Sequence, residues 1–526
     1  MKFLNHFSLL CVFFFSANTF LAQEKFTISG EIRESRTGET MIGAVVFLAG
    51  TPFGATSNNF GYYSITAPAG QYQLKVSFVG FQEIVQTLDL KKNELLNFDL
   101  EEYKSRDLVI QADRNRNTES TDMGRIELPV DQIKKLPVVF GEVDILKTIA
   151  LLPGVQSAGE GNTGFYVRGG GIDQNLILLD NATVYNASHL FGFFSVFNAD
   201  AVKNIELFKG GVPSGYGGRL SSVLDISLRD GNYKTFHGTG GIGTIASRFT
   251  AEGPIKKDTS SFIISGRRTY IDFLLKPLIN SRPNIQGTGY YFYDLNAKFN
   301  YKLSSKDWIS ISAYLGRDVF SFSSAKAGFS TKIPWGNATS TLRWNHVFSP
   351  KLFMNTMFYF TDYSFSFEGG QEQFTFGLKS GIRDYGSKIQ FSYFPNPNHK
   401  IKWGVDYTYH IFTPNNSYAS SGDTQFNLNN SSRLNSHESA AYIQDEWDIN
   451  EKIKVNLGLR QSYFLHTGSF TRYIYPETAG LIGAGSPQTI TYGNGEKVAD
   501  YWGFEPRISG RYLIKEGSSI KAGYNR

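Results

Sequence analysis

Residues 231–526 consist of short runs in which apolar and polar residues alternate and aromatic residues stand near the ends. Period-two alternation over roughly 10 residues is typical of strands that face lipid on one side and a polar interior on the other. Short turns such as Asn450–Lys452 alternate with longer polar stretches, Thr413–Ser436 and Gly468–Asp500. A soluble repeat or propeller would show a fixed period, which is missing here. The pattern predicts a transmembrane antiparallel β-barrel. Example runs are Tyr291–Phe299, Trp308–Tyr314, Ile401–Tyr409, Ala440–Trp447 and Ile453–Arg460.

The first 22 residues have the pattern of an export signal. Lys2 precedes the apolar run Phe7–Phe15, and the small and polar stretch Ser16–Ala22 ends at a plausible cleavage site. The run is shorter than the roughly 20 apolar residues that a membrane-spanning helix needs. We therefore expect residues 1–22 to be a signal peptide. The only cysteine, Cys11, lies within the apolar run without small residues before it, which argues against a lipoprotein.

Composition excludes several classes of function. Removal of the signal peptide leaves no cysteine, which excludes disulfides, cysteine–zinc sites and cysteine nucleophiles. The 52 Lys and Arg against 47 Asp and Glu are spread along the chain, so no basic stripe for nucleic acid is expected. Neither a His-Glu-x-x-His motif nor a Gly-x-Ser-x-Gly motif is present, and we predict no enzyme, no catalytic residue, no metal site and no cofactor. The scattered histidines include His189, His237, His346, His399, His410 and His437.

Residues 23–100 form a separate zone of short alternating runs, broken every 8–12 residues by Gly, Asn or Pro. This spacing predicts a small β-sandwich. A polar linker, residues 101–121, follows and contains one apolar island, Leu108–Ile110. The physics of the sequence leaves two interpretations of this island open. It is either an isolated contact or an extended segment that pairs with a strand of a partner.

Residues 122–230 mix helix and strand signals and predict a compact α+β domain. Residues Gly141–Leu152 show helical spacing and stop at Pro153-Gly154. Gly-rich breaks separate the strand-like runs that follow, and none of them has the Gly-Lys-Ser/Thr that a phosphate-binding loop requires. We therefore interpret the glycines as tight turns. The strand-like runs are Phe165–Val167, Asn175–Leu179, Asn204–Phe208 and Val223–Leu228.

These zones together resemble a TonB-dependent outer-membrane receptor of a SusC-like or related kind. Residues 122–230 are similar to the plug of such receptors, and Tyr442–Trp447 with Gly458–Arg460 is similar to a recurring barrel hairpin. Residues 23–100 resemble a carboxypeptidase-regulatory-like domain, a name that implies no peptidase activity. The segments that carry the plug resemblance are Phe165–Gly171, Asp173–Asp180, Val184–Ser195, Ile205–Gly211, Tyr216–Arg219 and Ser221–Ile226.

The resemblance implies active import of a scarce or bulky nutrient across the outer membrane of a Gram-negative bacterium, with the N-terminal domain in the periplasm. The implied partners are the TonB energy transducer, the outer-membrane lipids, an unidentified nutrient and a surface lipoprotein that acts as a lid. The alternative hypothesis is an outer-membrane binding or adhesion protein without transport. A segment that binds TonB would distinguish the two. We place that segment, the TonB box, at Asp107, Leu108, Val109, Ile110, Gln111 and Ala112.

The resemblance also implies a 22-stranded barrel around the plug. Residues 231–526 provide only about 13 strands at the usual length, so we expect the barrel in this chain to be incomplete at its C-terminal end.

Two arginines are candidates for holding the plug, because plug arginines in the family pair with glutamates of the barrel wall. Arg168 precedes three glycines, and Arg219 follows a glycine turn. Strand alternation places Tyr442, Gln444 and Glu446 on the interior face, so Glu446 is the predicted partner of Arg168 or Arg219. Alternatively, either arginine caps carbonyl groups of the plug itself.

Overall fold

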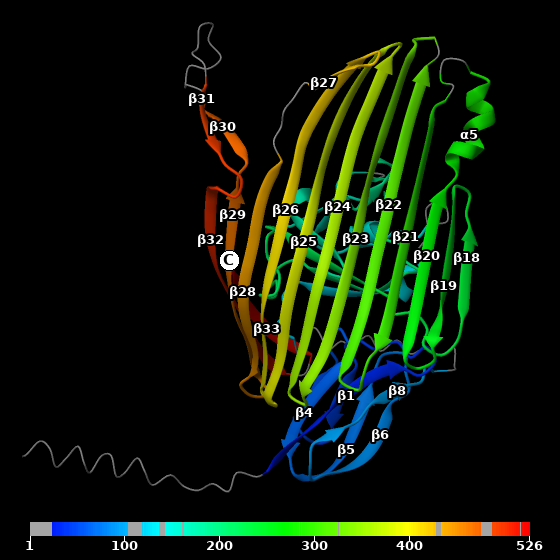
Figure 1. Cartoon of the computed structure of the whole chain (residues 1–526). Helices are drawn as coiled ribbons and strands as arrows, with labels where there is room; N and C mark the ends of the chain where they lie inside the picture. Colours follow the sequence, from blue (N-terminus) through cyan, green and yellow to red (C-terminus); the bar gives the residue numbers. More distant parts are fainter. Residues whose placement is uncertain are drawn as a thin grey trace, which may run out of the picture.

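The computed structural model describes residues 24–103, 118, 120–135, 142–159, 162–282, 285, 287–324, 326–427, 433–474, 487–515 and 517–526. The predicted signal peptide and the predicted TonB box lie outside these residues. The described chain forms a small N-terminal β domain, an internal α+β domain and a tall curved sheet (Figure 1). No helix in this part of the chain is long and apolar enough to cross a membrane.

The N-terminal domain contains two small sheets that pack against each other. In one sheet β1 pairs with β4, β7 and β8, and the other has the order β3-β2-β5-β6. Alternation places Leu74 and Val76 of β5 in a shared core with Ile28 and Ile32 of β1. This arrangement confirms the predicted β-sandwich. The strands are β1 (Lys25–Glu34), β2 (Val45–Leu48), β3 (Gly54–Thr56), β4 (Tyr62–Pro68), β5 (Gly70–Ser77), β6 (Ile84–Leu90), β7 (Glu94–Leu95) and β8 (Phe98–Leu100).

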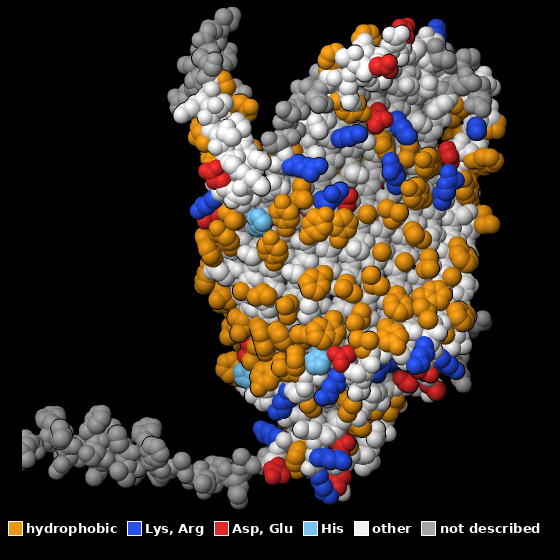
Figure 2. All heavy atoms as spheres, viewed as in Figure 1, with side chains coloured by type: hydrophobic (Ala, Val, Ile, Leu, Met, Phe, Trp, Pro, Cys, Tyr) orange, Lys and Arg blue, Asp and Glu red, His pale blue; other side chains and the backbone are white. Residues whose placement is uncertain are grey.

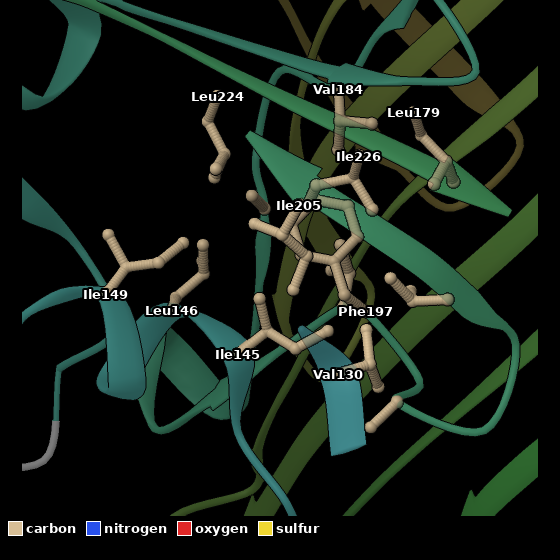
Figure 3. Close-up of a cluster of buried hydrophobic side chains, with 14 of the residues drawn as sticks. Val130, Ile145, Leu146, Ile149, Leu179, Val184, Phe197, Ile205, Leu224 and Ile226 are labelled. Carbon is tan, nitrogen blue, oxygen red and sulfur yellow. The ribbon is translucent and has the colours of Figure 1, made fainter. Parts of the chain in front are cut away.

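The internal domain, which we call the plug, is built on a mixed sheet of order β13-β12-β17-β16-β9. Only the β12–β17 pair is parallel. Buried aliphatic side chains from the sheet and the short helices meet in one core (Figure 3). The elements are β9 (Arg125–Pro129), α3 (Val130–Ile133), α4 (Ile145–Ile149), β10 (Val155–Ser157), β11 (Phe165–Val167), η1 (Ile172–Gln174), β12 (Asn175–Leu179), β13 (Ala182–Thr183), β14 (Ser188–His189), η2 (Leu190–Gly192), β15 (Phe194–Ser195), β16 (Val202–Phe208) and β17 (Ser222–Leu228).

The helix predicted over Gly141–Leu152 is shorter than expected. It begins only at Ile145, because the Asp144 side chain accepts a hydrogen bond from the backbone NH of Lys147 and caps the first turn. Within it, Ile145, Leu146 and Ile149 are buried in the plug core. The four strand-like runs predicted in this zone correspond to β11, β12, β16 and β17.

The curved sheet is the wall of the barrel and contains 14 strands among the described residues, all paired antiparallel. Its neighbours follow chain order apart from β27, which pairs only with β26. The strands are β18 (His237–Ile242), β19 (Ala246–Lys256), β20 (Ser260–Thr269), β21 (Gly289–Lys302), β22 (Asp307–Ser324), β23 (Phe329–Ser349), β24 (Leu352–Gln371), β25 (Phe374–Asn396), β26 (His399–Ser421), β27 (Thr424–Asn427), β28 (Leu434–Asp448), β29 (Ile453–Thr467), β32 (Lys497–Lys515) and β33 (Ser518–Asn525).

Alternation along each wall strand separates an apolar outer face from a polar inner face. In β23, Leu342 and Trp344 are 45% and 41% exposed, whereas Arg343 and Asn345 between and after them are buried. Hydrophobic side chains accordingly form a broad band over the outside of the wall (Figure 2). This two-faced pattern is what a lipid-facing strand requires.

In the two long polar stretches, 413–436 and 468–500, most of the described residues form strands, and one helix was not predicted. β26 continues to Ser421, and residues of Gly468–Asp500 form the hairpin β30 (Phe470–Ile474) with β31 (Gln488–Tyr492) and the start of β32. The upper part of β26 is mostly polar on both faces, so period-two hydrophobicity does not reveal it. Helix α5 (Ile271–Asn280) connects β20 to β21 at the end of the wall opposite the N-terminal domain (Figure 1).

Candidate functional site

A cavity of about 1090 Å³ lies between the plug and the wall strands β26, β28, β29 and β32. Its lining residues in β28 and β29, such as Glu438 and Phe464, belong to the halves of these strands that point away from the N-terminal domain, and we call it the upper chamber. The plug contributes its loops around Asn162–Phe165, Tyr185–Ser188 and Gly217–Leu220. A cleft with apolar walls and a few convergent polar groups is the usual form of a small-molecule site.

Charged and aromatic side chains converge on the upper chamber. The Tyr185 hydroxyl of the plug donates to Asp384 of β25 (2.6 Å), which also accepts from Nδ1 of His410 (2.7 Å). Nε2 of His410 lies 3.6 Å from Glu438. Burial and the Asp384 carboxylate raise the pKa of Tyr185, so its hydroxyl stays protonated and donates. One plug side chain is thereby joined to three strands of the wall.

Glycine allows the plug backbone to approach this network closely. Gly218 has a positive φ of 77°, and a Cβ atom there would lie 2.8 Å from a carboxylate oxygen of Glu438. Across the chamber, Phe464 and Tyr501, on the same strand faces as the inward-pointing Arg460 and Arg507, form a tilted ring pair with centroids 6.3 Å apart. The chamber therefore combines a carboxylate, an imidazole and aromatic faces, a set that binds ligands through hydrogen bonds and stacking.

The opposite side of the plug is fixed to the wall by a buried network, which we call the latch. It consists of His189 and Glu142 of the plug with Arg267, Asp294 and Asp318 of the wall. Nδ1 of His189 donates to Asp318 (2.6 Å), and its Nε2 lies 3.4 Å from Asp294. Arg267 contacts Asp294 (2.7 Å) and Glu142 (3.4 Å). All five side chains are buried, so each charge depends on the others for compensation.

His189 is the plug residue at the centre of the latch. Its ring stacks on Phe292 with centroids 4.1 Å apart, and the adjacent Leu190 NH donates to Tyr290 (2.6 Å) and Asp318 (3.0 Å). Burial lowers the pKa of His189, but the carboxylates of Asp318 and Asp294 outweigh burial and raise it overall. The imidazole is therefore held as a cation that links the plug to two wall strands.

A second cavity of about 230 Å³, which we call the lower chamber, lies on the other side of the plug toward the N-terminal domain. Its plug wall includes Asp225, which accepts from the Tyr216 hydroxyl (2.7 Å). Burial, with a contribution from the neighbouring Glu206, raises the pKa of Asp225 to about 6 despite the hydrogen bond from Tyr216. Within the described part of the chain, no group of three or more His, Cys, Asp or Glu is arranged to hold a metal ion.

The structure does not bring Glu446 together with Arg168 or Arg219. Glu446 lines the lower chamber and lies 3.6 Å and 3.8 Å from Lys402 and Lys400 of the neighbouring strand. Arg219 lines the upper chamber and donates to the carbonyl of Gly218 (2.8 Å), the alternative role considered for it. Arg168 has a positive φ of 50°, and its guanidinium lies beside Gly210 of the plug.

The alternation argument around Glu446 places the neighbouring side chains as the structure does. Tyr442 and Gln444 are buried toward the interior, and Ile443 is 52% exposed on the outer face. Gln444 accepts a hydrogen bond from the plug, from Ser214 NH (2.8 Å). On the outer face, Asp445 accepts from Nδ1 of His399 (2.7 Å) at the start of β26.

Charged pairs across the interface between plug and wall mostly have the opposite polarity to the predicted one. Carboxylates come from the plug and cations from the wall: Glu142 with Arg267 (3.4 Å), Asp200 with Arg248 (2.9 Å) and Asp180 with Lys298 (3.6 Å).

The sequence does carry one signal for these contacts. Ionisable residues stand at alternating positions inside aromatic strands, such as Asp294 and Lys298 in β21. His189 is isolated in the sequence and has no comparable signal.

Comparison with family models identifies both the N-terminal domain and the wall. Residues 175–526 match the model described as TonB dependent receptor-like, beta-barrel. Residues 28–110 match the model described as CarboxypepD_reg-like domain.

Solved structures with the same fold are transporters and receptors. The copper transporter OprC superposes with a TM-score of 0.55 at 12% identity, over 77% of this chain and 64% of that one. The unliganded ferric citrate transporter FecA gives a TM-score of 0.54 at 15% identity, over 79% of this chain and 64% of that one. The ferric-catecholate import receptor Fiu from E. coli gives 0.52 at 13% identity, over 78% and 70%. This chain thus spans about two thirds of their length, and at these identities the likeness concerns the fold.

Proposed function

The chain belongs to the TonB-dependent receptor-like β-barrel family, and on that premise we propose that it imports a scarce or bulky nutrient across the outer membrane of a Gram-negative bacterium. The observation that carries the proposal is the upper chamber, about 1090 Å³ in volume, bounded by plug loops on one side and wall strands on the other. A ligand in that space contacts both the moving part and the fixed part of a gated transporter. Its occupancy can therefore bias the position of the plug.

The chemistry of the upper chamber supports a polar ligand with flat or apolar faces. Arg219, His410 and Glu438 offer both signs of charge, and Phe464 and Tyr501 offer aromatic surfaces. The solved structures named above are transporters and import receptors. The chemistry supports capture and release.

Energy for import would enter at the segment that follows the N-terminal domain. We place the contact with TonB at Asp107–Ala112, because an extended apolar segment can add to a sheet edge of a partner through main-chain hydrogen bonds. It lies between β8, which ends at Leu100, and β9, which begins at Arg125. A pull on it acts on both the N-terminal domain and the plug.

The test is a pair of substitutions at Val109 in the full-length receptor, expressed in a strain that lacks the native gene. Val109→Pro removes a main-chain NH and fixes φ, whereas Val109→Ala keeps the backbone able to pair. Growth is compared on the complex medium that supports the wild-type strain, and molecules that co-purify with each variant are identified by mass spectrometry. We expect Val109→Pro to abolish receptor-dependent growth and keep the co-purifying ligand.

The control, Val109→Ala, should retain both growth and ligand. Receptor-dependent growth of the Val109→Pro strain would overturn the assignment of the TonB segment. If both Val109 variants keep the co-purifying ligand and growth is independent of residues 107–112, the result would instead favour an outer-membrane binding protein without transport.

A further inference from the structure

The N-terminal domain lies directly against the lower end of the barrel (Figure 1). Phe60 and Tyr62 of this domain stack on Phe353 of β24, with ring centroids 5.5 Å and 5.3 Å apart. The hydroxyl groups of Tyr62 and Ser64 both donate to the carbonyl of Pro350, at 2.9 Å and 2.7 Å. Pro350 lies between β23 and β24, so this first contact binds the domain to a turn at the rim of the barrel.

A second contact lies where the plug chain enters the wall. The backbone NH of Gly231 donates to Glu39 (2.8 Å), and Arg229 lies 3.6 Å from the same carboxylate. Thr40 donates to Asp230 (3.1 Å), and the NH of Tyr233 donates to the carbonyl of Thr37 (2.7 Å). This second contact fixes the domain at the segment between β17 and β18. Two separate contacts determine the orientation of a rigid domain, which a single one would leave free to pivot.

The docked domain forms one boundary of the lower chamber. Glu31, Thr40, Phe60 and Tyr62 of the N-terminal domain line that cavity together with plug and wall residues. A molecule leaving the upper chamber past the plug would enter the lower chamber and meet this surface. The domain thus stands in series with the plug along the interior of the barrel.

We propose that the N-terminal domain is a lid on the lower mouth of the barrel, and that it leaves the rim when cargo passes. The contacts are of the right kind for a reversible closure, because one aromatic patch and a few polar bonds resemble a transient interface more than a permanent one. The lid ends beside the segment proposed to bind TonB: Gln82 NH donates to the Glu101 carbonyl (2.8 Å), and Phe81 pairs with Glu102. A pull on the following residues reaches the lid first.

The lid proposal rests on the proposed function only for the direction of transport and the source of the pull. The closure itself is a property of the resting protein. Its test therefore uses a strain without TonB, so that the failure of the lid and the failure of energised import give different results.

A disulfide can test whether the lid is docked in the membrane. An ideal Cβ atom on Gly38 would lie 3.0 Å from the Cβ of Tyr233, slightly closer than the 3.5–4.5 Å that is usual across a disulfide. In Gly38→Cys/Tyr233→Cys we expect most of the protein in isolated outer membranes to form the bond on mild oxidation. The matched control is Gly50→Cys/Tyr233→Cys, since Gly50 has nearly the same positive φ and nothing within 4 Å. Equal and low yields in the two pairs would overturn the docking.

Vancomycin leakage tests whether the docked lid closes the path. In a background with a loosened plug, Arg267→Ala, cells should become several-fold more sensitive to this large antibiotic. Oxidation of the Gly38→Cys/Tyr233→Cys pair in that background should return sensitivity toward the wild-type level, and a reductant should restore it. The Gly50→Cys control pair should not respond. Full cross-linking with unchanged leakage would overturn the lid, and Asp318→Asn provides a second loosened background if Arg267→Ala is not exported.

Discussion

The two sides of the plug meet the barrel wall through different chemistry. On the side of β20–β22, buried charged side chains of both parts face each other, as in Arg267 with Glu142 and His189 with Asp318. On the side of β25, β29 and β32, wall side chains donate mainly to plug carbonyls. Arg507 contacts the carbonyls of Val212 and Pro213 (3.1 Å and 2.6 Å). Above these contacts the upper chamber separates plug from wall.

The difference indicates which side moves. A buried charge that loses its partner is costly, so the latch holds one arrangement. A carbonyl contact is independent of the side chain on the plug and can be exchanged for water or for the next carbonyl at little cost. We therefore expect the plug to stay attached at the latch while the chamber side yields first, which would open a path beside the wall strands that face the ligand.

The largest expected effect is at the centre of the latch. Arg267→Ala removes the cation shared by the buried Asp294 and Glu142, which keep only His189 (3.4 Å) and Arg248 (3.7 Å) respectively, at a cost of up to about 3–5 kcal/mol. The plug should lose protection from hydrogen exchange throughout β16 and β17, and cells should admit vancomycin. The neighbouring Arg268 is a matched control, because its side chain is 53% exposed and 3.4 Å from Asp272. Arg268→Ala should change stability by less than about 0.5 kcal/mol. Equal effects of the two variants would contradict the latch.

The next effect in size is a pH dependence confined to the latch side. His189 has a raised pKa in the folded state, so its contribution is complete below the unfolded value near 6.5 and is lost as pH rises through the folded value. Hydrogen bonds of a charged group are worth about 1.5–3 kcal/mol. Urea denaturation of the plug, followed by limited proteolysis, should show a falling midpoint as pH rises. His189→Gln should flatten this dependence.

The control for this titration is His237→Gln. His237 is exposed and bonds only locally to Thr235 (2.9 Å), so its replacement should leave the pH profile unchanged. A profile that is the same in the His189 variant and the wild type would contradict the role of His189 in the pH dependence.

Local patterns account for the predictable part of the molecule. Alternation in Tyr442–Trp447 gave the correct face for each side chain, because the two faces of a wall strand differ in polarity at every second position. It could not give the partner of Glu446. That partner depends on the register Lys400↔Glu446 between β26 and β28, which alternation within one strand does not determine.

Local patterns do not predict long-range contacts, or strands that are polar on both faces. His189 is hydrogen-bonded to Asp318, which lies 129 residues further along the chain. The sequence around either residue contains no pattern that predicts this contact. The polar upper part of β26 pairs with β25 as far as Ser421, although its composition resembles that of a loop. Sequence thus predicted the wall, the plug strands and the N-terminal sandwich, and it missed the residues that hold them together.

A smaller effect is expected from crowding the chamber side. Gly218→Ala lowers the stability of the plug by about 1–2 kcal/mol, because alanine is strained in the left-handed backbone conformation. It also brings a methyl group within 2.8 Å of Glu438. Gly169→Ala has the same backbone strain, because φ at Gly169 is 85°, but it adds no contact, since nothing lies within 4 Å. If the chamber side is compliant, Glu438 moves aside and the two variants differ by only a few tenths of a kcal/mol in plug stability. A difference above about 2 kcal/mol would show that this side is as rigid as the latch.

The smallest effect concerns the predicted pairing of Arg219 with Glu446. Arg219 donates to the carbonyl of Gly218 at the upper chamber, whereas Glu446 lies near Lys400 and Lys402 at the lower one. Arg219→Ala should therefore change stability by no more than about 0.5 kcal/mol and admit no vancomycin. Because the two sites share no partner, Arg219→Ala/Glu446→Ala should equal the sum of the single variants within about 0.3–0.5 kcal/mol. The Arg168→Ala/Glu446→Ala pair should be additive in the same way. A coupling of 1 kcal/mol or more in either double mutant would mean that the plug exchanges partners in the membrane and that its chamber side holds a charged contact after all.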